Sequence, residues 1–179
     1  FAGLIDLSTP EYTYDFLLNV TRLRPYYLNL NRNDPEYFAS FFLRTDLSGS
    51  RLDDLNGDLQ LVNSFFRRTG AQVQMYDILA SITNGPDTSA LSLRSEIIDA
   101  DLSGRYRLSQ LPAMFQYIVN EHIGLFGSPE YIPLEDEQYQ IDLQLKDASP
   151  LLEFFYPQFS IAKNSSLSGS GEISDNGML

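Results

Sequence analysis

The sequence predicts a mainly β fold with one amphipathic helix, and three observations lead to this prediction. Several segments alternate apolar and polar residues, which is the pattern of a strand with one apolar face. Turn signals such as Asn84-Gly85-Pro86 separate these segments. The spacing of three and four that is typical of a helix is clearest at residues 109–123.

The N-terminal half contains the clearest alternation. Apolar residues occupy every second position of residues 12–20, namely Tyr12, Tyr14, Phe16, Leu18 and Val20. A strand is also predicted at 57–65, where Leu59, Leu61 and Phe65 follow the same alternation. Another is predicted at 71–82, where Val73, Met75 and Leu79 all occupy odd-numbered positions. A turn is predicted at 67–70. Residues 41–47 are predicted as a strand rather than as the continuation of a helix opened by Asp34-Pro35-Glu36.

The C-terminal half alternates less regularly. Leu91 and Leu93 occupy odd-numbered positions, and after Ile97-Ile98 the apolar residues occupy even-numbered positions. We therefore predict a β-bulge near Ile97 within a continuing strand. A strand returns at 139–145. The sequence "PLLEFFYP" predicts a short turn or helix, and "SSLSGSGEIS" predicts the beginning of another strand.

One helix is predicted between these strands. Its apolar residues, spaced three and four apart, are Leu111, Met114, Phe115, Ile118 and Val119, followed by His122. Ser109 suits the N-cap, Pro112 suits the first turn and Gly124 suits the end of the helix.

Composition excludes several classes of function. The formal charge of −12 repels phosphates, which disfavours nucleic acid and anionic lipid headgroups as partners but leaves the apolar part of a lipid open. Without cysteine the chain has no disulfide, no thiolate metal site and no cysteine nucleophile, and a single histidine leaves little for a zinc site or a triad. We therefore expect no cofactor and no metal.

Candidate catalytic residues are few, and each has a simpler structural interpretation. His122 lacks companions beyond Glu121, so a packed helix residue is favoured over a base or a ligand. The acids Glu135 to Glu137 lack the glycine turn of a calcium loop, and a solvated edge is favoured. No spacing singles out an acid and a base among the 24 carboxylates, so the sequence favours a protein that is not an enzyme.

No segment is long enough to span a bilayer, because the apolar stretches fall far short of roughly 20 residues. The chain begins at Phe1 without methionine and ends at "DNGML". We expect residues 1–179 to be a single β-rich segment of a longer protein.

A short motif recurs three times, as "DLSG" at 46–49 and 101–104 and as "SLSG" at 166–169. An apolar residue follows each glycine by three or four positions, at Leu52, Leu108 and Ile173. Because glycine permits positive φ and serine bonds to nearby backbone, a structural role at strand ends is favoured over a binding loop.

The recurring motif occurs together with three longer stretches, "LDDLNGDLQL", "LRSEIIDADLSGRYRLSQLPAMFQYIV" and "YQIDLQLKDASPLLEFFYPQFS". This arrangement resembles the TamB-like translocation and assembly module proteins of the AsmA-like superfamily. The resemblance runs from about Tyr12 to Gly169 and suggests an internal or C-terminal segment. It implies a curved antiparallel sheet that forms an elongated trough, sometimes called a β-taco, with a hydrophobic groove. It also implies a periplasmic location and a parent protein anchored in the inner membrane of a Gram-negative bacterium. The predicted helix departs from an all-β trough.

The resemblance further implies that the groove carries phospholipid acyl chains between the inner and outer membranes. We expect the groove to be lined by ten residues: Tyr14, Phe16, Leu18, Leu59, Leu61, Val73, Met75, Ile141, Leu143 and Leu145. An alternative is a scaffold that assists outer-membrane protein assembly, such as that of autotransporters, with a TamA-type barrel. A second alternative is a glycan-binding or glycoside hydrolase β domain, which requires a cleft with exposed tyrosines and two close carboxylates.

Overall fold

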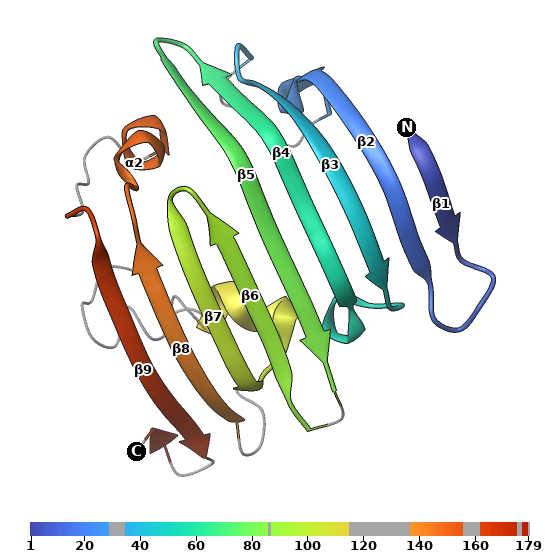
Figure 1. The fold of residues 1–179 in the computed structure, drawn as a ribbon, viewed down its shortest axis with the longest axis vertical. Coiled ribbons are helices and arrows are strands. Elements are labelled where there is room, and N and C mark those ends of the chain that lie inside the picture. Colours follow the sequence, from blue (N-terminus) through green and yellow to red (C-terminus); the bar gives the residue numbers. More distant parts are fainter. Residues whose placement is uncertain (29–34, 86, 115–136, 156–161, 175–176, 179) are drawn as a thin grey trace.

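The computed structural model contains one antiparallel sheet of ten strands, and the strands lie side by side in the order in which they occur in the sequence (Figure 1). It describes residues 1–28, 35–85, 87–114, 137–155, 162–174 and 177–178. The first and last strands lie at opposite edges, so the sheet is not closed into a barrel. The predicted mainly β fold with a curved antiparallel sheet is confirmed.

The strands β2 to β5 contain 11 to 14 residues, whereas β1 contains 5 and β6 to β9 contain 7 to 10. Their bounds are β1 Ala2–Asp6, β2 Thr13–Leu23, β3 Phe38–Ser48, β4 Asn56–Arg68, β5 Ala71–Asn84, β6 Ser89–Ser95, β7 Ile98–Arg105, β8 Glu137–Leu145, β9 Ser165–Ser174 and β10 Gly177–Met178. The 3₁₀ turns are η1 Pro25–Leu28, η2 Leu52–Asp54 and η3 Leu108–Gln110, and the short helix α2 covers Ser149–Phe155.

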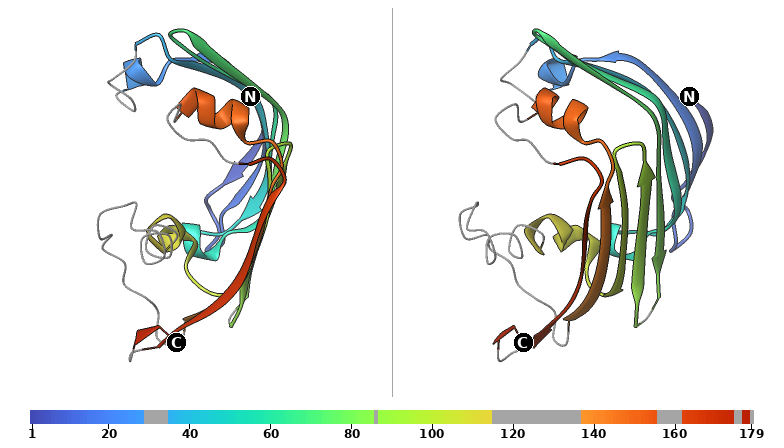
Figure 2. Two further views of the ribbon diagram at one scale, coloured as in Figure 1. Left: turned by 90° about the vertical axis from the view of Figure 1, so that its left-hand side faces the viewer. Right: turned by 60° about the vertical axis from the view of Figure 1, so that its left-hand side comes forward.

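The sheet is bent into an arc along its strands, and all the helical elements lie inside the arc (Figure 2). The curved sheet therefore has the shape of a trough that runs across the strands, and its two rims are the two ends of the strands. α2 lies inside the upper rim, while η2 and the turns that follow η3 lie inside the lower rim.

Two residues with left-handed backbone lie where strands shift register, one near the end of β2 and one in the middle of β4. Arg22 has φ 54° and Asn63 has φ 50°. The register between β2 and β3 shifts at Arg22, and the register between β3 and β4 shifts near Asn63. Each shift inserts one residue, which bends a strand and reverses the faces to which the following side chains point.

This reversal corrects two expectations. Phe65 was expected to share a face with Leu59 and Leu61, but after the bulge Phe66 takes that face, because it pairs with the buried residues Ala39 and Val73. Leu79 was expected to share a face with Val73 and Met75. Leu79 instead pairs with Gln60 and Arg94 on the opposite, polar face. The consecutive residues Tyr76 and Asp77 are both exposed, so the alternation of buried and exposed side chains along β5 shifts by one position there.

The bulge predicted near Ile97 is wrong. β6 ends at Ser95 and β7 begins at Ile98, so the change of parity is a tight hairpin. The Ser95 hydroxyl oxygen accepts hydrogen bonds from the backbone N–H groups of Ile97 (3.2 Å) and Ile98 (3.0 Å). A serine therefore makes this turn without the glycine, proline or asparagine that usually marks one.

The helix predicted at 109–123 begins within the described residues. η3 leads directly into a helical turn at 111–114, and the remaining positions, with His122, lie outside the described residues. Glu135 and Asp136 also lie outside them. The short helix predicted in "PLLEFFYP" is present as α2, and the strand predicted after it is present as β9.

The core cluster lies between these helical turns and the sheet. It consists of Leu102, Tyr106, Leu108, Met114 and Tyr139, with Ile82, Leu91, Leu111 and Ile141 packed against it. Because the turns lie inside the arc, this cluster identifies the face of Leu91, Leu102 and Ile141 as the concave face.

The repeated motif ends strands in two of its three copies. Gly49 follows the end of β3 with φ +135°, and Gly104 lies one residue before the end of β7 with φ +133°. A 3₁₀ turn follows each of them, η2 and η3. The third copy differs, because Gly169 lies within β9.

Candidate functional site

The concave face is built from rows of residues that run from strand to strand. Directly paired residues of neighbouring antiparallel strands point to the same face, so the pairing of β2 to β9 connects them into rows parallel to the groove. The first row is Tyr14, Leu47, Gly57, Ile82, Leu91, Leu102, Ile141 and Gly169. It contains the core residues Leu91, Leu102 and Ile141 and is therefore concave.

Two further rows lie beside the first, and we call the three rows together the groove floor. The second is Phe16, Thr45, Leu59, Ala80, Leu93, Ala100, Leu143 and Leu167. The third contains Leu18, Leu43, Leu61, Ile78 and Ser95 on β2 to β6, then Ile98, Leu145 and Ser165 on β7 to β9. The polar member of the second row, Thr45, is satisfied, because its hydroxyl donates to the Tyr14 carbonyl at 3.0 Å.

The ten residues expected to line the groove all lie on the concave side. Eight of them belong to the groove floor, and all eight are half-buried: Tyr14, Phe16, Leu18, Leu59, Leu61, Ile141, Leu143 and Leu145. The other two, Val73 and Met75, lie beyond the bend in the part of β5 nearest the upper rim, and only 3% and 7% of their surfaces are exposed. α2 packs against β5.

Several floor residues were absent from that expectation. Leu43 and Leu47 come from β3, Ile78 and Ile82 come from β5, and Leu91, Leu93 and Leu102 come from β6 and β7. Alternation within 41–47 and at Leu91 and Leu93 was the available signal. Alternation did not identify Ile78 and Ile82. They occupy even-numbered positions and Met75 an odd-numbered one, but the bend between them places all three on the concave side.

Helical elements stand over both sides of the floor. At the upper rim, Phe154 of α2 is 1% exposed, its ring lies 6.3 Å from that of Tyr37, and the Arg68 guanidinium lies 5.2 Å from the ring. Burial raises the pKa of the Tyr37 phenol. α2 is thus fixed to the sheet by aromatic and cation–π contacts.

At the lower rim, η2 and η3 contact each other across the ends of the intervening strands (Figure 2). The Asp53 carboxylate accepts hydrogen bonds from the Ser109 N–H (2.7 Å) and from the Ser109 hydroxyl (2.8 Å). Tyr106 is 5% exposed and donates its hydroxyl proton to the Leu102 carbonyl at 3.3 Å. Burial raises the pKa of Tyr106 to about 12.

The convex face has the opposite chemistry. One row across it is Asp15, Asp46, Asp58, Ser81, Ser92, Asp101, Asp142 and Ser168. Asp58 accepts a hydrogen bond from the Ser81 hydroxyl at 2.6 Å, and Asp101 accepts two from Arg94, each at 2.8 Å. A row of acids and hydroxyls on one face and rows of aliphatic side chains on the other make the sheet strongly amphipathic.

Ion pairs fix carboxylates of this face in their charged form. The hydrogen bond from Arg94 lowers the pKa of Asp101, and the hydrogen bond from Lys146 lowers that of Asp99. Lys146 Nζ lies 2.7 Å from Asp99 Oδ1 and also donates to the Ser95 carbonyl at 2.7 Å. These contacts join the β6–β7 hairpin to the segment after β8.

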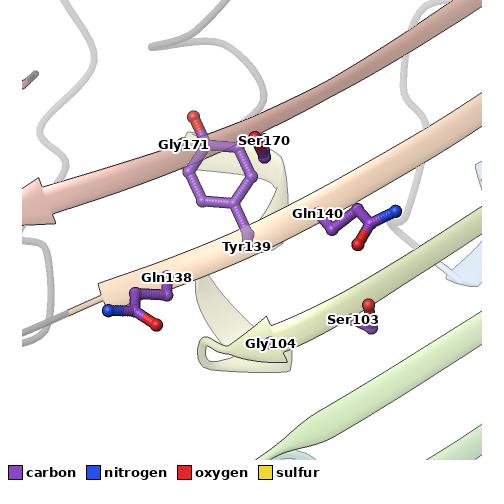
Figure 3. Close-up of a pocket in the computed structure, with 7 residues that line it drawn as sticks. All are labelled: Ser103, Gly104, Gln138, Tyr139, Gln140, Ser170 and Gly171. Carbon is purple, nitrogen blue, oxygen red and sulfur yellow. The ribbon is translucent and has the colours of Figure 1, made fainter.

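A shallow depression lies where β7, β8 and β9 run side by side (Figure 3). It is lined by Ser103, Gly104, Gln138, Tyr139, Gln140, Ser170 and Gly171. The Tyr139 ring lies across β9 at Gly171, where a methyl group on the glycine would collide with the phenol. None of the lining residues is a carboxylate, an amine, a guanidinium or an imidazole, so the depression offers hydrogen bonds rather than acid–base chemistry.

The described residues contain no group of three or more potential metal ligands and no helix that is long and apolar enough to cross a membrane. In comparisons with known proteins, no protein-family model, no curated protein and no solved structure matches this chain.

Proposed function

We propose that this chain is a segment of a TamB-like, periplasm-spanning protein whose hydrophobic groove carries phospholipid between the inner and outer membranes. The proposal assigns no catalytic step to the chain. The observation that carries it is the groove floor, an apolar surface that continues without interruption by a charged residue across eight strands, β2 to β9.

The dimensions of the floor suit acyl chains. Strands lie about 4.8 Å apart, so eight of them give a floor about 34 Å long. The hydrocarbon core of a bilayer is about 30 Å thick and contains two layers of chains, so one chain extends about 15 Å. The second and third rows of the floor are therefore long enough for a lipid to lie lengthwise, beside the first row, where the turns after η3 pack on Leu91, Leu102 and Ile141.

The chemistry of the floor suits movement rather than capture. Most residues of the floor are leucine, isoleucine or alanine, whose side chains offer apolar contact without directional hydrogen bonds. An acyl chain that slides by one strand exchanges one set of mainly apolar contacts for another. The polar convex face keeps the outside of the segment in water, so the apolar path is confined to one side of the sheet.

Photo-crosslinking tests the proposal directly. A photoreactive phenylalanine analogue replaces Leu143 in the floor, and the purified chain is incubated with radiolabelled phosphatidylethanolamine before irradiation. We expect a lipid adduct, because Leu143 lies in the second row of the floor. The matched control replaces Leu79, which pairs with Gln60 and Arg94 on the convex face, and is expected to give none.

Equal labelling from both positions, or labelling from neither, contradicts the proposal. Native mass spectrometry of the unmodified chain provides a second readout, in which phospholipid bound after purification is expected.

A scaffold that assists outer-membrane protein assembly is the second candidate, and one observation favours it. β1 pairs only with β2, so its outer edge is available to another strand, and its apolar residues Leu4 and Ile5 are 58% and 46% exposed. An edge of this kind binds an extended client by backbone hydrogen bonds. Protein adducts from a photoreactive residue at Leu4, without lipid adducts from Leu143, favour the scaffold.

A further inference from the structure

The upper rim of the sheet carries a concentration of arginine and tyrosine. Three chain segments meet there, residues 22–28, 35–39 and 65–73, at the ends of β2 and β4 and the beginnings of β3 and β5 (Figure 1). We call the surface formed by their exposed and half-buried arginines and by η1 the basic rim. Its members are Arg22, Arg24, Arg67 and Arg68, together with Tyr26, Tyr27 and Leu28 of η1.

The strand pairing brings the arginines together. Leu23, the neighbour of Arg24, pairs with Ala39, and Phe38 pairs with Arg67, so Arg24 and Arg67 lie two strands apart. At about 4.8 Å per strand their backbones are about 10 Å apart. Between them the Phe38 ring lies 5.5 Å from the Arg22 guanidinium.

The basic rim is locally cationic in a strongly acidic chain. Its three segments contain four arginines and one carboxylate, Glu36, which accepts a hydrogen bond from the Thr69 hydroxyl at 3.1 Å. The salt bridges among the described residues are Arg94–Asp101, Lys146–Asp99 and Lys163–Asp147, and none of them uses a rim arginine. Charges interact strongly only within about 8 Å at physiological ionic strength, so an approaching surface experiences the rim rather than the net charge of −12.

The rim also exposes apolar and amphipathic side chains beside these cations. Tyr27 is 69% exposed, Leu28 56% and Tyr26 39%. The Arg24 guanidinium lies 6.0 Å from the Tyr27 ring. Tyrosine with arginine is the combination that is enriched where proteins meet the headgroup layer of a bilayer, since the ring enters the interface and the guanidinium binds phosphate.

We propose that the basic rim docks the chain on the surface of an anionic phospholipid bilayer, with Tyr27 and Leu28 entering the interface and Arg24 and Arg67 binding headgroup phosphates. This inference goes beyond the proposed function and is independent of what the groove carries. It departs from the expectation from net charge that anionic headgroups are poor partners, because it rests on the local charge of the basic rim.

Vesicle flotation tests the inference. The purified chain is mixed at low ionic strength with vesicles of phosphatidylcholine alone or of phosphatidylcholine with phosphatidylglycerol. We expect binding only to the vesicles that contain phosphatidylglycerol, and release at high salt. The double substitution Arg24→Gln with Arg67→Gln is expected to reduce the partition coefficient about thirtyfold, the loss predicted for two cationic side chains near an anionic surface. Arg68 is left in place because it contacts Phe154.

A matched control removes two arginines from the opposite end of the strands. Arg105 and Arg107 are both exposed and lie at the lower rim, at the end of β7 and just before η3. Replacing both by glutamine changes the net charge equally and is expected to leave vesicle binding unchanged. Tyr27→Ser with Leu28→Ser is expected to weaken binding while preserving the salt dependence, and circular dichroism confirms the fold of each variant.

Three results overturn the inference: no binding of the wild-type chain to anionic vesicles at low salt, equal binding to neutral vesicles, or equal losses in the upper-rim and lower-rim variants. Binding of a DNA oligonucleotide through Arg24 and Arg67 in the absence of vesicle binding overturns it as well. Lipid adducts from Leu143 report on the groove separately, so either proposal fails without the other.

Discussion

Gly104 shows how a single residue determines the spacing of two strands. Its φ is +133°, and a β-carbon there would collide with the Gln138 carbonyl oxygen and lie 2.8 Å from the Tyr139 Cα on the neighbouring strand. Only glycine allows β7 and β8 to approach so closely. Tyr139 belongs to the core cluster, so this approach also positions a residue of the groove.

We predict that Gly104→Ala destabilises the chain by about 2 to 3 kcal/mol, from the strained φ and the backbone collision together. Gly70→Ala is the control, because Gly70 has φ +76° but a β-carbon there meets no atom within 4 Å. Its expected loss is about 1 kcal/mol, from the φ alone. Urea unfolding of both variants measures the difference, and equal losses contradict the role given to the strand approach.

Tyr106 gives the structure a pH dependence at the alkaline end. Burial raises its pKa to about 12, whereas a phenol in the unfolded chain titrates near pH 10. The folded state thus favours the protonated phenol, and this contribution to stability is complete below pH about 10 and disappears as the pH rises toward about 12.

We expect the free energy of unfolding of the wild-type chain to fall more steeply between pH about 10 and about 12 than that of Tyr106→Phe. The variant also loses the hydrogen bond to the Leu102 carbonyl, at a cost of about 1 kcal/mol that does not depend on pH. Parallel slopes for the two proteins would show that the phenol is not held in the protonated state by folding.

At the scale of elements, period-two alternation predicted most strands because it depends only on neighbouring residues. Tyr14, Phe16 and Leu18 share a face in any uninterrupted strand, and so do Ile141, Leu143 and Leu145. The bend was not predictable in this way. Arg22 and Asn63 adopt positive φ. Asparagine adopts this conformation more readily than most residues, but neither residue type by itself marks the position of a bulge.

The β6–β7 hairpin illustrates the same limit. A parity change at Ile97-Ile98 is compatible with a bulge or with a two-residue turn, and only the pairing of Arg94 with Asp99 distinguishes them. The contact between η2 and η3 was likewise not predictable, because Asp53 and Ser109 are far apart in sequence and meet only when the intervening strands, β4 to β7, are paired in register.

The η2–η3 contact is expected to hold the helical turns at 108–114 over the lower part of the groove. We predict that Asp53→Ala accelerates hydrogen exchange of the amides of these turns, because it removes both hydrogen bonds to Ser109. The global stability is expected to fall by no more than about 1 kcal/mol, since both residues are exposed.

Asp87→Ala is the control for this prediction. Asp87 is an exposed acid in the turn between β5 and β6 and forms none of the hydrogen bonds to Ser109. Its removal is expected to leave exchange at 108–114 unchanged. If Asp53→Ala also leaves exchange there unchanged, the core contacts of Leu108 and Met114 hold the turns without the carboxylate.

At the scale of the whole molecule, the amphipathic groove results from one rule repeated across the sheet. The strand pairs from β2 to β9 place mainly apolar residues opposite one another on the concave face, so the rows of the floor align from strand to strand. The same repetition leaves an edge at β1, because nothing in the pattern terminates the sheet there.

The β1 edge is expected to make the isolated chain associate with itself. β1 is exposed along most of its length, and an open apolar edge strand pairs readily with another strand. We predict that Leu4→Lys reduces this association. Leu4 pairs with Asp15, so a lysine there faces a carboxylate of opposite charge on β2. Its own charge on β1 disfavours the pairing of this edge with another strand.

Sedimentation velocity over a range of concentrations measures this effect. The wild-type chain is expected to shift toward larger species as its concentration rises, and Leu4→Lys is expected to remain smaller at the same concentrations. Leu52→Lys, at a leucine of similar exposure on η2, adds the same charge away from the edge and is expected to behave as the wild type. An equal effect of both substitutions would mean that charge repulsion, and not the blocked edge, prevents association.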